Sequence, residues 1–510
     1  MEYFQVTAGI LFGVKKGKIF EGVRLQKFVH GGQAMGELED GRKVLVWGGL
    51  PGELVNVRIT KKKKSYLEGV VEQVIEPSED RIDPEEPESY LSTSPWQTMT
   101  FEAENRHKQS VLAETFEREG VDVAWSEFAH TEQQYGYRNK IEIGFWGDDD
   151  GLHLAHFRRG SHGKQIVTEN KLADEAINKA ARAMRDELNR LGVWAGDLKT
   201  LVLRSSRSSA KPRDHASKHR PTRAEPSSQS YSAGYDPSTL NSSSARQEYA
   251  DHDSEAASNF ENKVVGALFV KKRLNLDNFK MPSELTGVDI YFSNPQSPAS
   301  VPNDRLYSFG DITLTDTISE QDIMYDVLSF FQVNLPIFEH ALTDIRHHLP
   351  VKNPTRDKIF HGGMKVVDMY SGVGTIGLAV GADVLVESDD ACVRMANINT
   401  KTPRNNHIQA WPVYGGGGRV VHAASEEALE YITSDAVVIV DPPRAGLHAD
   451  VVERILKEKP PLVMYLSCNP ATQARDVQLL KQHYDIQFAR GYNFFPRTPH
   501  IESLIVLKRQ

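Results

Sequence analysis

The chain has 510 residues, of which 39% are hydrophobic and 25% charged, and its formal net charge is −9. This length predicts about three domains of roughly 150 residues each, and no apolar run approaches the roughly 20 residues of a membrane span. The composition excludes membrane insertion and uniform attraction to nucleic acid. Positive charge is clustered along the chain, however, so local contacts with RNA stay open.

The cysteine content points to a reducing compartment. Cys392 and Cys468 are the only cysteines, too few for a disulfide framework or an all-cysteine metal site. The apolar stretch 8–14 lacks a basic flank before it and a cleavage site after it, so it does not resemble a signal peptide. We expect a cytoplasmic monomer with no metal site, no membrane contact and no protein partner.

The N-terminal region has the pattern of a small β-barrel. Residues 23–76 alternate apolar and polar side chains between glycines, which indicates short strands. Four lysines at 61–64 are more often a solvated turn, but on a small barrel they are candidate contacts for RNA phosphates. We assign this domain to residues 21–78, after an N-terminal extension of residues 1–20. The acidic, proline-rich stretch 77–87 then indicates a linker.

A second domain is predicted over residues 79–335, as a central α+β domain. Helical periodicity runs from 101 to 119, and strands are expected at 141–145 and 152–155. Aromatic and basic residues interleave beside these strands as an RNA-binding face requires, although surface arginines are common and the pattern alone is weak. The candidate RNA contacts in this region are Arg138, Lys140 and Arg158.

A polar insertion interrupts the central domain. Residues 205–262 are rich in serine, arginine, aspartate and proline, with few apolar side chains. Such a segment cannot bury enough surface to offset the entropy of ordering it, so we expect it to be disordered. Segments 201–203 and 264–270 on either side both resemble strands, so the insertion is expected to replace a hairpin turn.

The C-terminal residues 336–510 alternate strands and helices, which predicts a parallel, doubly wound α/β sheet. Three apolar strands, 366–369, 436–440 and 462–466, are each followed at once by chemically distinctive residues. Ligands bind at the carboxyl ends of the strands in such sheets. The three strand ends therefore predict one crevice.

The first strand end predicts a nucleoside cofactor. Residues 372–377 match G-x-G-x-x-G, in which glycines permit a tight turn and close approach to a ligand. The pattern alone is weak, because an empty strand-to-helix turn looks the same. The next strand ends in Glu387, whose carboxylate could accept hydrogen bonds from both ribose hydroxyls, or simply be solvated. Nicotinamide and S-adenosylmethionine sites share this geometry, so both cofactors stay open here.

The second strand end distinguishes these cofactors. It carries Asp-Pro-Pro-Arg at 441–444, for which a dehydrogenase has no evident use. Methyltransferases acting on nucleic acid often hold the target base with an Asp/Asn-Pro-Pro turn. Those that methylate exocyclic amines follow the prolines with an aromatic residue, whereas here Arg444 follows. The target atom is therefore not expected to be an exocyclic amine.

The third strand end supplies a nucleophile. Cys468 precedes Asn-Pro, which favours a sharp exposed turn, and a thiolate added to carbon 6 of uracil makes carbon 5 reactive toward a methyl group. Arg444 is the expected positive neighbour of this thiol. A base must then remove the carbon 5 proton, and Glu502 is the candidate, although such a residue alone is more often a surface carboxylate. Cys392, inside an expected helix, is predicted to be a buried small hydrophobe.

With these residues, the chain resembles the family of RNA uracil-C5 methyltransferases, which form 5-methyluridine in transfer and ribosomal RNA. The motifs that carry the resemblance are the cysteine segment 467–472, the loop 441–446 and the ending Pro-His-Ile-Glu at 499–502. The likeness spans nearly the whole chain. It implies a Rossmann-like class I methyltransferase domain that uses S-adenosyl-L-methionine, with Cys468 as nucleophile and Glu502 as base.

The resemblance also covers the other regions. Residues 23–76 are similar to the TRAM domain, an OB-like RNA-binding barrel, and residues 137–140 and 158–159 match the domain that such enzymes lay against RNA. Substrate contacts are accordingly expected from Arg444 and the three central cations. The cofactor contacts that the resemblance implies are Gln332, Tyr370, Thr375, Glu387 and Asp441.

Three departures from the family are visible. Many TRAM-bearing members hold an iron–sulfur cluster with cysteines near 92–97, where this chain has none, so we expect no cluster. The helix expected between Thr375 and Gly381 is shorter than usual. The insertion 205–262 is also unlike the family.

Two other functions remain open at this point. One is an NAD-dependent dehydrogenase, and the other is an inactive RNA-binding or folding-assisting protein of the same fold. Neither explains the joint presence of five residues, namely Gln332, Glu387, Asp441, Cys468 and Glu502. The sequence does not decide between ribosomal and transfer RNA, although the barrel favours ribosomal RNA by analogy.

Overall fold

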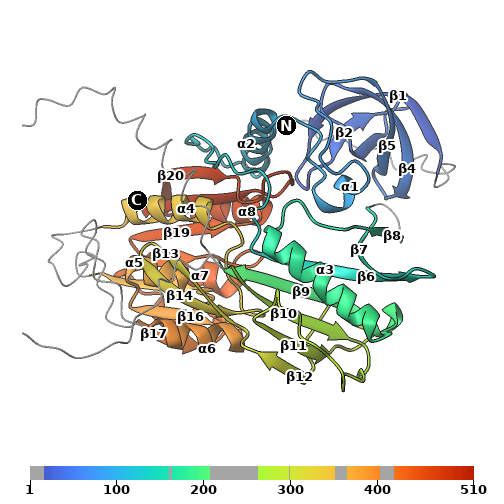
Figure 1. Cartoon of the computed structure of the whole chain (residues 1–510). Helices are drawn as coiled ribbons and strands as arrows, with labels where there is room; N and C mark the ends of the chain where they lie inside the picture. The colour runs from blue at the N-terminus through green and yellow to red at the C-terminus, as the bar shows by residue number, and fades with distance from the viewer. Residues whose placement is uncertain (1–16, 160–162, 207–261, 298, 351–363, 402–417) are drawn as a thin grey trace, which may run out of the picture.

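The structure is a computed structural model that describes residues 17–159, 163–206, 262–297, 299–350, 364–401 and 418–510. Figure 1 shows an N-terminal barrel, a central sheet and a C-terminal sheet, with helix α2 (Phe101–Arg118) between the barrel and the C-terminal sheet. The predicted fold class is therefore confirmed. Within the described ranges, no helix is both long enough and apolar enough to cross a bilayer.

The N-terminal barrel is closed, with strand order β1-β2-β3-β5-β4. Its interior is built by alternation, since Val44, Val46, Val55 and Val57 are fully buried while the residues between them are not. The barrel predicted from residue 23 begins slightly earlier, at Ile19. Its strands are β1 (Ile19–Phe28), β2 (Ala34–Glu37), β3 (Lys43–Trp47), β4 (Leu54–Lys62) and β5 (Leu67–Glu76).

Helix α2 joins the barrel to the C-terminal domain. Thr100 caps it, because its side chain accepts a hydrogen bond from the backbone N–H of Ala103. The buried face of α2, with Leu112 and Phe116, belongs to one continuous apolar cluster that also contains barrel residues and C-terminal sheet residues. The barrel is thus packed against the rest of the protein. A short helix, α1 (Tyr90–Thr93), precedes α2.

The central sheet has the order β12-β11-β10-β9-β6-β7-β8. Helix α3 (Glu175–Arg190) packs on one face, and the hairpin of β13 and β14 packs on part of the other. The strands are β6 (Lys140–Asp148), β7 (Gly151–Phe157), β8 (Lys164–Ile166), β9 (Leu198–Ser206), β10 (Lys263–Val270), β11 (Gly287–Phe292), β12 (Asp304–Gly310), β13 (Thr313–Ile318) and β14 (Gln321–Asp326).

The expected hairpin around the insertion is present. Strands β9 and β10 pair antiparallel, and Ser206 lies opposite Lys263 at the end of the ladder. The predicted start of the insertion is wrong by two residues, because Ser205 and Ser206 are buried in β9. Residues 207–261, to which the prediction of disorder applies, lie outside the described residues.

The C-terminal sheet has the order β17-β16-β15-β18-β19-β21-β20. Its strands are β15 (Lys365–Met369), β16 (Val384–Glu387), β17 (Arg419–His422), β18 (Ala436–Val440), β19 (Leu462–Ser467), β20 (Tyr484–Tyr492) and β21 (Glu502–Arg509). Its helices are α4 (Leu335–His348), α5 (Thr375–Val380), α6 (Asp390–Asn399), α7 (Ala449–Glu458) and α8 (Pro470–Leu480). Helix α5 is short, as expected.

One part of the sheet differs from the parallel arrangement that alternation predicted. The five strands β15 to β19 pair in parallel. In contrast, β21 is antiparallel to both of its neighbours, β19 and β20. The chain reaches β21 through a loop after β20, without the crossover helix that parallel pairing requires. Because Ser467 pairs with Ser503, the beginning of β21 lies beside the end of β19. Glu502 therefore reaches the same sheet edge as Cys468.

Candidate active site

The glycine turn after β15 has an unusual backbone. Tyr370, Gly372 and Gly374 adopt φ values of 64°, 56° and 90°, in the left-handed region. Glycine reaches that region without steric cost, while a non-glycine residue such as Tyr370 is strained there. At Gly377 the Asp368 carboxylate accepts the backbone N–H at 2.7 Å, and a Cβ would lie 2.8 Å from the same oxygen. The turn thus requires its glycines for close approach.

Glu387, at the end of β16, holds this turn in place. One carboxylate oxygen accepts the N–H of Gly372 at 2.7 Å, and the other accepts those of Ser388 and Asp389 at 2.8 Å each. Glu387 is therefore a structural part of the turn as well as a candidate ribose contact. Sequence analysis had considered only ribose binding or solvation.

Buried polar atoms beside the turn fit a nucleoside cofactor. Ser371 Oγ and Asp368 Oδ1 are buried and have no hydrogen-bond partner among the described residues. Burying such atoms without a partner costs stability, so a ligand with matching polar groups is favoured here. Thr375, the first residue of α5, is nearly buried at the same turn.

The segment before α4 crosses the turn from the other side. Phe330 is 60% exposed, and its ring would lie 3.5 Å from a Cβ at Gly372. Gln332 is nearly buried, and its carbonyl accepts the side-chain amide of Asn139 at 3.0 Å. The Phe330 N–H donates to Cys392 Sγ at 3.2 Å, and burial raises the pKa of this thiol to about 12. Cys392 is buried in α6, as predicted.

Cys468 lies in a bend directly after β19 and is half-buried. The bend is fixed by Asn469, whose backbone N–H donates to Ser467 Oγ at 3.1 Å and whose side-chain oxygen caps α8. The Asn469 side chain also donates to the carbonyl of Arg444 at 2.7 Å. These contacts join the loop after β18 to the loop after β19. The sharp turn expected at Cys468 is therefore present, although its thiol is half-buried and not exposed.

Acidic groups surround the Cys468 thiol. Burial, followed by the carboxyls of Glu502 and Asp441, raises the pKa of Cys468 to about 12. Arg444 is the positive neighbour that the sequence indicated, and its charge and hydrogen bond lower this pKa. The net shift is nevertheless upward, because burial and the two carboxyls outweigh one arginine. The thiolate is therefore scarce in the free protein.

Asp441 lies between the thiol and the cofactor turn. Burial raises the pKa of Asp441 to about 7. The Asp441 carboxyl in turn raises the pKa values of Cys468, Glu502 and Asp368, each of which is shifted mainly by burial. Arg444 partly offsets the upward shift of the Glu502 pKa. Cys468 and Glu502 belong to the thiol site, and Asp368 belongs to the glycine turn. Because the Asp441 carboxyl affects the pKa values of all three, it is close to both places.

Positive charge gathers at His500, two residues before Glu502. The pKa of His500 is lowered to about 3 by burial and by four cations, Arg444, Lys108, Arg138 and Arg159. The Arg444 guanidinium lies 3.4 Å from His500 Nδ1. Lys108 is fully buried and paired with Glu104, but the other three cations form, with the neutral imidazole, a surface suited to RNA phosphates.

The predicted substrate residues do not all meet here. Arg138 and Arg444 both act on His500. Lys140 instead lies close to Arg204 and Cys392, and its pKa is lowered to about 8, first by burial. Arg158, which follows β7, donates a hydrogen bond to Gln165 and is not among the cations that lower the pKa of His500. The roles of these cations stay predictions.

Two further residues reach this site, namely Arg159, which the resemblance covers only as part of residues 158–159, and His30, which the sequence does not indicate. Arg159 acts on His500, contacts the ring of Trp47 on the barrel at 4.1 Å and donates to the Leu91 carbonyl at 2.6 Å. His30, in the barrel turn after β1, has its pKa lowered by burial and then by Arg444. The alternation of side chains along a strand could have separated Arg159 from Arg158. No local pattern places His30 beside a C-terminal loop.

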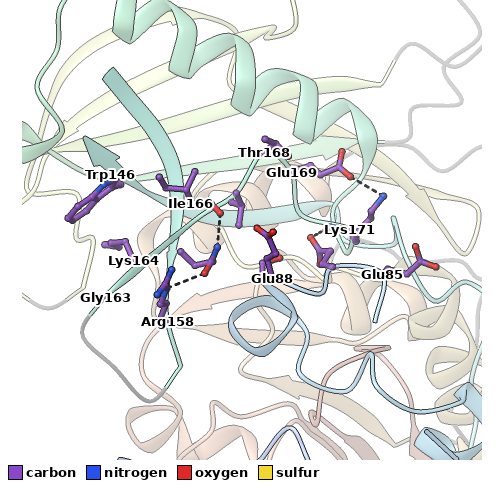
Figure 2. Close-up of a pocket in the computed structure, with 14 residues that line it drawn as sticks. Glu85, Glu88, Trp146, Arg158, Gly163, Lys164, Ile166, Thr168, Glu169 and Lys171 are labelled. Carbon is purple, nitrogen blue, oxygen red and sulfur yellow. Dashed lines mark hydrogen bonds and ion pairs between the residues drawn. The ribbon is translucent and has the colours of Figure 1, made fainter. Parts of the chain in front are cut away.

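Arg158 instead lines a separate pocket of about 940 Å³, shown in Figure 2. One wall comes from the acidic linker, with Glu85 and Glu88, and the other from β6 to β8, with Trp146 and Lys164. None of the predicted catalytic or cofactor residues lines it. The crevice at the sheet edge is therefore the candidate active site.

Across the part of the chain that the structure describes, His, Cys, Asp and Glu side chains form no group of three suited to a metal ion. In the segment where the resemblance places cluster ligands, Gln97 donates to Ser94 Oγ at 2.5 Å and to Glu86 at 2.9 Å. The expected lack of an iron–sulfur cluster stays a prediction.

Comparison with known proteins adds independent support. Residues 428–510 match the family model for tRNA (Uracil-5-)-methyltransferase, and residues 19–71 match that for the TRAM domain. An uncharacterized RNA methyltransferase of Nitratidesulfovibrio vulgaris is 26% identical over 503 residues, covering 96% of each chain. Another from Mycoplasma mobile is 32% identical over 206 residues, covering 39% of this chain and 50% of that one.

A solved structure has the same fold. The crystal structure of Pyrococcus abyssi tRNA (uracil-54, C5)-methyltransferase, in complex with S-adenosyl-L-homocysteine, aligns with a TM-score of 0.65 and 21% identity. The alignment covers 96% of this chain and 100% of that chain. The region matched by the first family model contains both Cys468 and Glu502. Over nearly its whole length the chain is thus similar to RNA methyltransferases, and its C-terminal region matches the family of tRNA (Uracil-5-)-methyltransferases.

Proposed function

We propose that this protein uses S-adenosyl-L-methionine to methylate carbon 5 of a uridine in RNA, through a covalent bond between Cys468 and carbon 6. The observation that carries the proposal is the pairing of β19 with β21, which brings Glu502 to the thiol. The electrostatic contact of Asp441 with both Cys468 and the cofactor turn supports it further. The dehydrogenase alternative explains neither feature.

The chemistry follows from these groups. Asp441, with its pKa raised to about 7 by burial, is partly ionised at neutral pH and can accept the thiol proton. The Cys468 thiolate adds to carbon 6, and the electrons of the carbon 5–carbon 6 bond make carbon 5 nucleophilic. The cofactor supplies the methyl group that carbon 5 accepts. Glu502, whose raised pKa makes it a strong base once it is ionised, then removes the carbon 5 proton, the double bond re-forms, and the sulfur–carbon bond breaks.

Cofactor binding is assigned to the glycine turn and its neighbours. The carboxylate oxygens of Glu387 have lone pairs that the backbone N–H groups do not use. These lone pairs would accept hydrogen bonds from the ribose hydroxyls. Asp441 would lie between the cofactor and the target base, as the chemistry requires. The other assigned contacts are Gln332, Tyr370 and Thr375.

The RNA is assigned to the basic surface around His500. The target uridine must leave its stack to reach a half-buried thiol, so the enzyme is expected to flip it out. Arg444 and Arg138 would hold adjacent phosphates. We assign residues 21–78 to RNA binding, 79–335 to the central domain and 336–510 to catalysis. We further propose that the enzyme acts as a monomer in the cytoplasm.

The function is tested by mapping 5-methyluridine in total RNA from cells with and without this protein. We expect at least one uridine of ribosomal or transfer RNA to lose its methyl group when the protein is absent. Purified protein with the cofactor should restore the same site in vitro. Label from the cofactor appearing on another nucleoside, or on no RNA, would contradict the proposal.

Adduct formation is expected to depend on pH. Because burial raises the pKa values of Cys468 and Asp441, the ionised forms become more populated as pH rises. The rate of covalent trapping by RNA containing 5-fluorouridine should rise with pH between about pH 5 and 8, by nearly tenfold per unit at the acid end and levelling off above about pH 7, because ionised Asp441 accepts the thiol proton. The measurements are made at constant ionic strength, because salt changes the affinity of the protein for RNA phosphates. A rate that is flat across this range would show that the thiolate forms without this ionisation.

A further inference from the structure

A turn of the barrel lies against the loop that carries the base. The barrel turn, residues 29–33, is closed by hydrogen bonds from Val29 N–H to the Gln33 carbonyl at 3.0 Å and from Gly32 N–H to the Val29 carbonyl at 2.9 Å. We call residues 497–502 the catalytic loop, because they end at Glu502. A Cβ at Gly32 would lie 2.0 Å from the Cβ of Pro499 in that loop. Nothing larger than glycine fits at this contact.

Trp96 fastens the two segments together. Its indole N–H donates to the Gly32 carbonyl at 3.0 Å, and its backbone N–H donates to the Arg497 carbonyl at 3.1 Å. The Trp96 ring also packs on Phe28 of β1, with centroids 4.6 Å apart. Trp96 is 2% exposed, so both hydrogen bonds are shielded from water. The barrel and the catalytic loop are therefore joined by a buried, specific contact.

Helix α2 holds the beginning of the catalytic loop. The Arg497 N–H donates to both carboxylate oxygens of Glu104 at 3.0 Å. Lys108 donates to the side-chain oxygen of Asn493 at 2.6 Å and to the carbonyl of Phe495 at 3.0 Å, just before the loop. Arg497 has φ 64°, a strained conformation for a residue with a side chain. Surrounding contacts must maintain that conformation.

The barrel turn also reaches the active site directly. His30 is open to solvent, yet protein around it and the charge of Arg444 lower its pKa. Arg444 is the same residue that contacts His500 and Cys468. The turn therefore forms part of the wall of the crevice, and its position is coupled to the catalytic loop.

We propose that the barrel turn and Trp96 are positioning elements of the active site, which hold the catalytic loop so that Glu502 can remove the carbon 5 proton. The inference rests on the proposed function and extends it. On this view the barrel contributes to turnover after RNA has bound, in addition to any contribution to RNA affinity. A barrel that only captured RNA would need no contact with Pro499.

The chain offers a matched pair of variants as a test. Gly31 and Gly32 have φ values of 96° and 91°, so alanine is strained equally at both. Around Gly31 no described atom would lie within 4 Å of an added Cβ, whereas Gly32 would collide with Pro499. Gly32→Ala should lower kcat at least tenfold with KM for RNA changed less than twofold. Gly31→Ala should stay within about threefold of the original protein in kcat.

A second readout reports on proton removal itself. With RNA deuterated at carbon 5 of the target uridine, Gly32→Ala should show a primary isotope effect on kcat that Gly31→Ala lacks. It should also accumulate the covalent adduct on denaturing gels. If Gly32→Ala does not fold, Trp96→Phe replaces it, because this variant keeps an aromatic ring beside Phe28 but removes the indole N–H that binds the Gly32 carbonyl. It should show the same isotope effect with a smaller loss of kcat.

Three outcomes overturn the inference. They are equal kcat values for the two glycine variants, a change confined to KM for RNA, and a loss of kcat without an isotope effect or adduct. Each of these can occur while the original protein forms 5-methyluridine and is trapped by 5-fluorouridine RNA. If the original protein does neither, the proposed function itself has failed. The two failures are thus distinguishable.

Discussion

Replacing Cys468 with alanine is expected to abolish methylation, with a loss of at least about a thousandfold in kcat, because no other described side chain at the site can add to carbon 6. The variant should also form no covalent complex with RNA containing 5-fluorouridine. Binding of S-adenosyl-L-homocysteine should be unchanged within about twofold, since the glycine turn does not depend on the thiol. Mobility on denaturing gels and calorimetric titration provide the two measurements.

Cys392 supplies the matched control for this prediction. It is the other cysteine of the chain, buried in α6 and bonded to the Phe330 N–H. Cys392→Ala should retain covalent trapping and substantial methylation. A trapped adduct that persists in Cys468→Ala and disappears in Cys392→Ala would reverse the assignment of the nucleophile.

Replacing Glu502 with glutamine is expected to stall the enzyme after methyl transfer. The amide keeps the shape of the side chain but cannot accept the carbon 5 proton, so multiple turnover should fall by about 10² to 10⁴. Thiolate attack and methyl transfer precede that step and should proceed in a single turnover. The methylated RNA should therefore remain attached to the protein, which a denaturing gel with methyl-labelled cofactor can show.

An exposed carboxylate tests whether the effect is specific. Glu453→Gln, on the outer face of α7, changes the same functional group without contact to the site. It should turn over at the original rate. Unimpaired multiple turnover in Glu502→Gln would remove Glu502 from the role of base, and Asp441 would then be the nearest remaining acid.

Much of this arrangement could be read from the sequence, because it is encoded locally. Alternation at residues 44–46 and 55–57 predicts barrel strands, and the glycines at 372–377 predict a turn before a helix. The strand ends at Asp441 and Cys468 could be assigned to one crevice because parallel strands share an edge. That inference needed only chain order and strand direction.

The remaining features depend on tertiary contacts that no local pattern encodes. Alternation does not specify strand direction, so the antiparallel return of β21 was not expected even though Glu502 was. Arg444 was expected to lower the pKa of Cys468. The pKa is instead raised, because the thiol is buried, and only the packed structure reveals that burial. His30 lies near Arg444 because the barrel docks on the catalytic loop, which is a contact between the two ends of the chain.

The ladder between β9 and β10 has a practical consequence for protein engineering. Ser206 and Lys263 face each other in register, so their backbones are only about 5 Å apart, the spacing of neighbouring strands. A tight Asn-Gly reversal is enough to bridge such a gap. A shortened chain with that dipeptide in place of residues 207–262 would keep every strand of the sheet, and would be a smaller specimen for crystallisation with RNA.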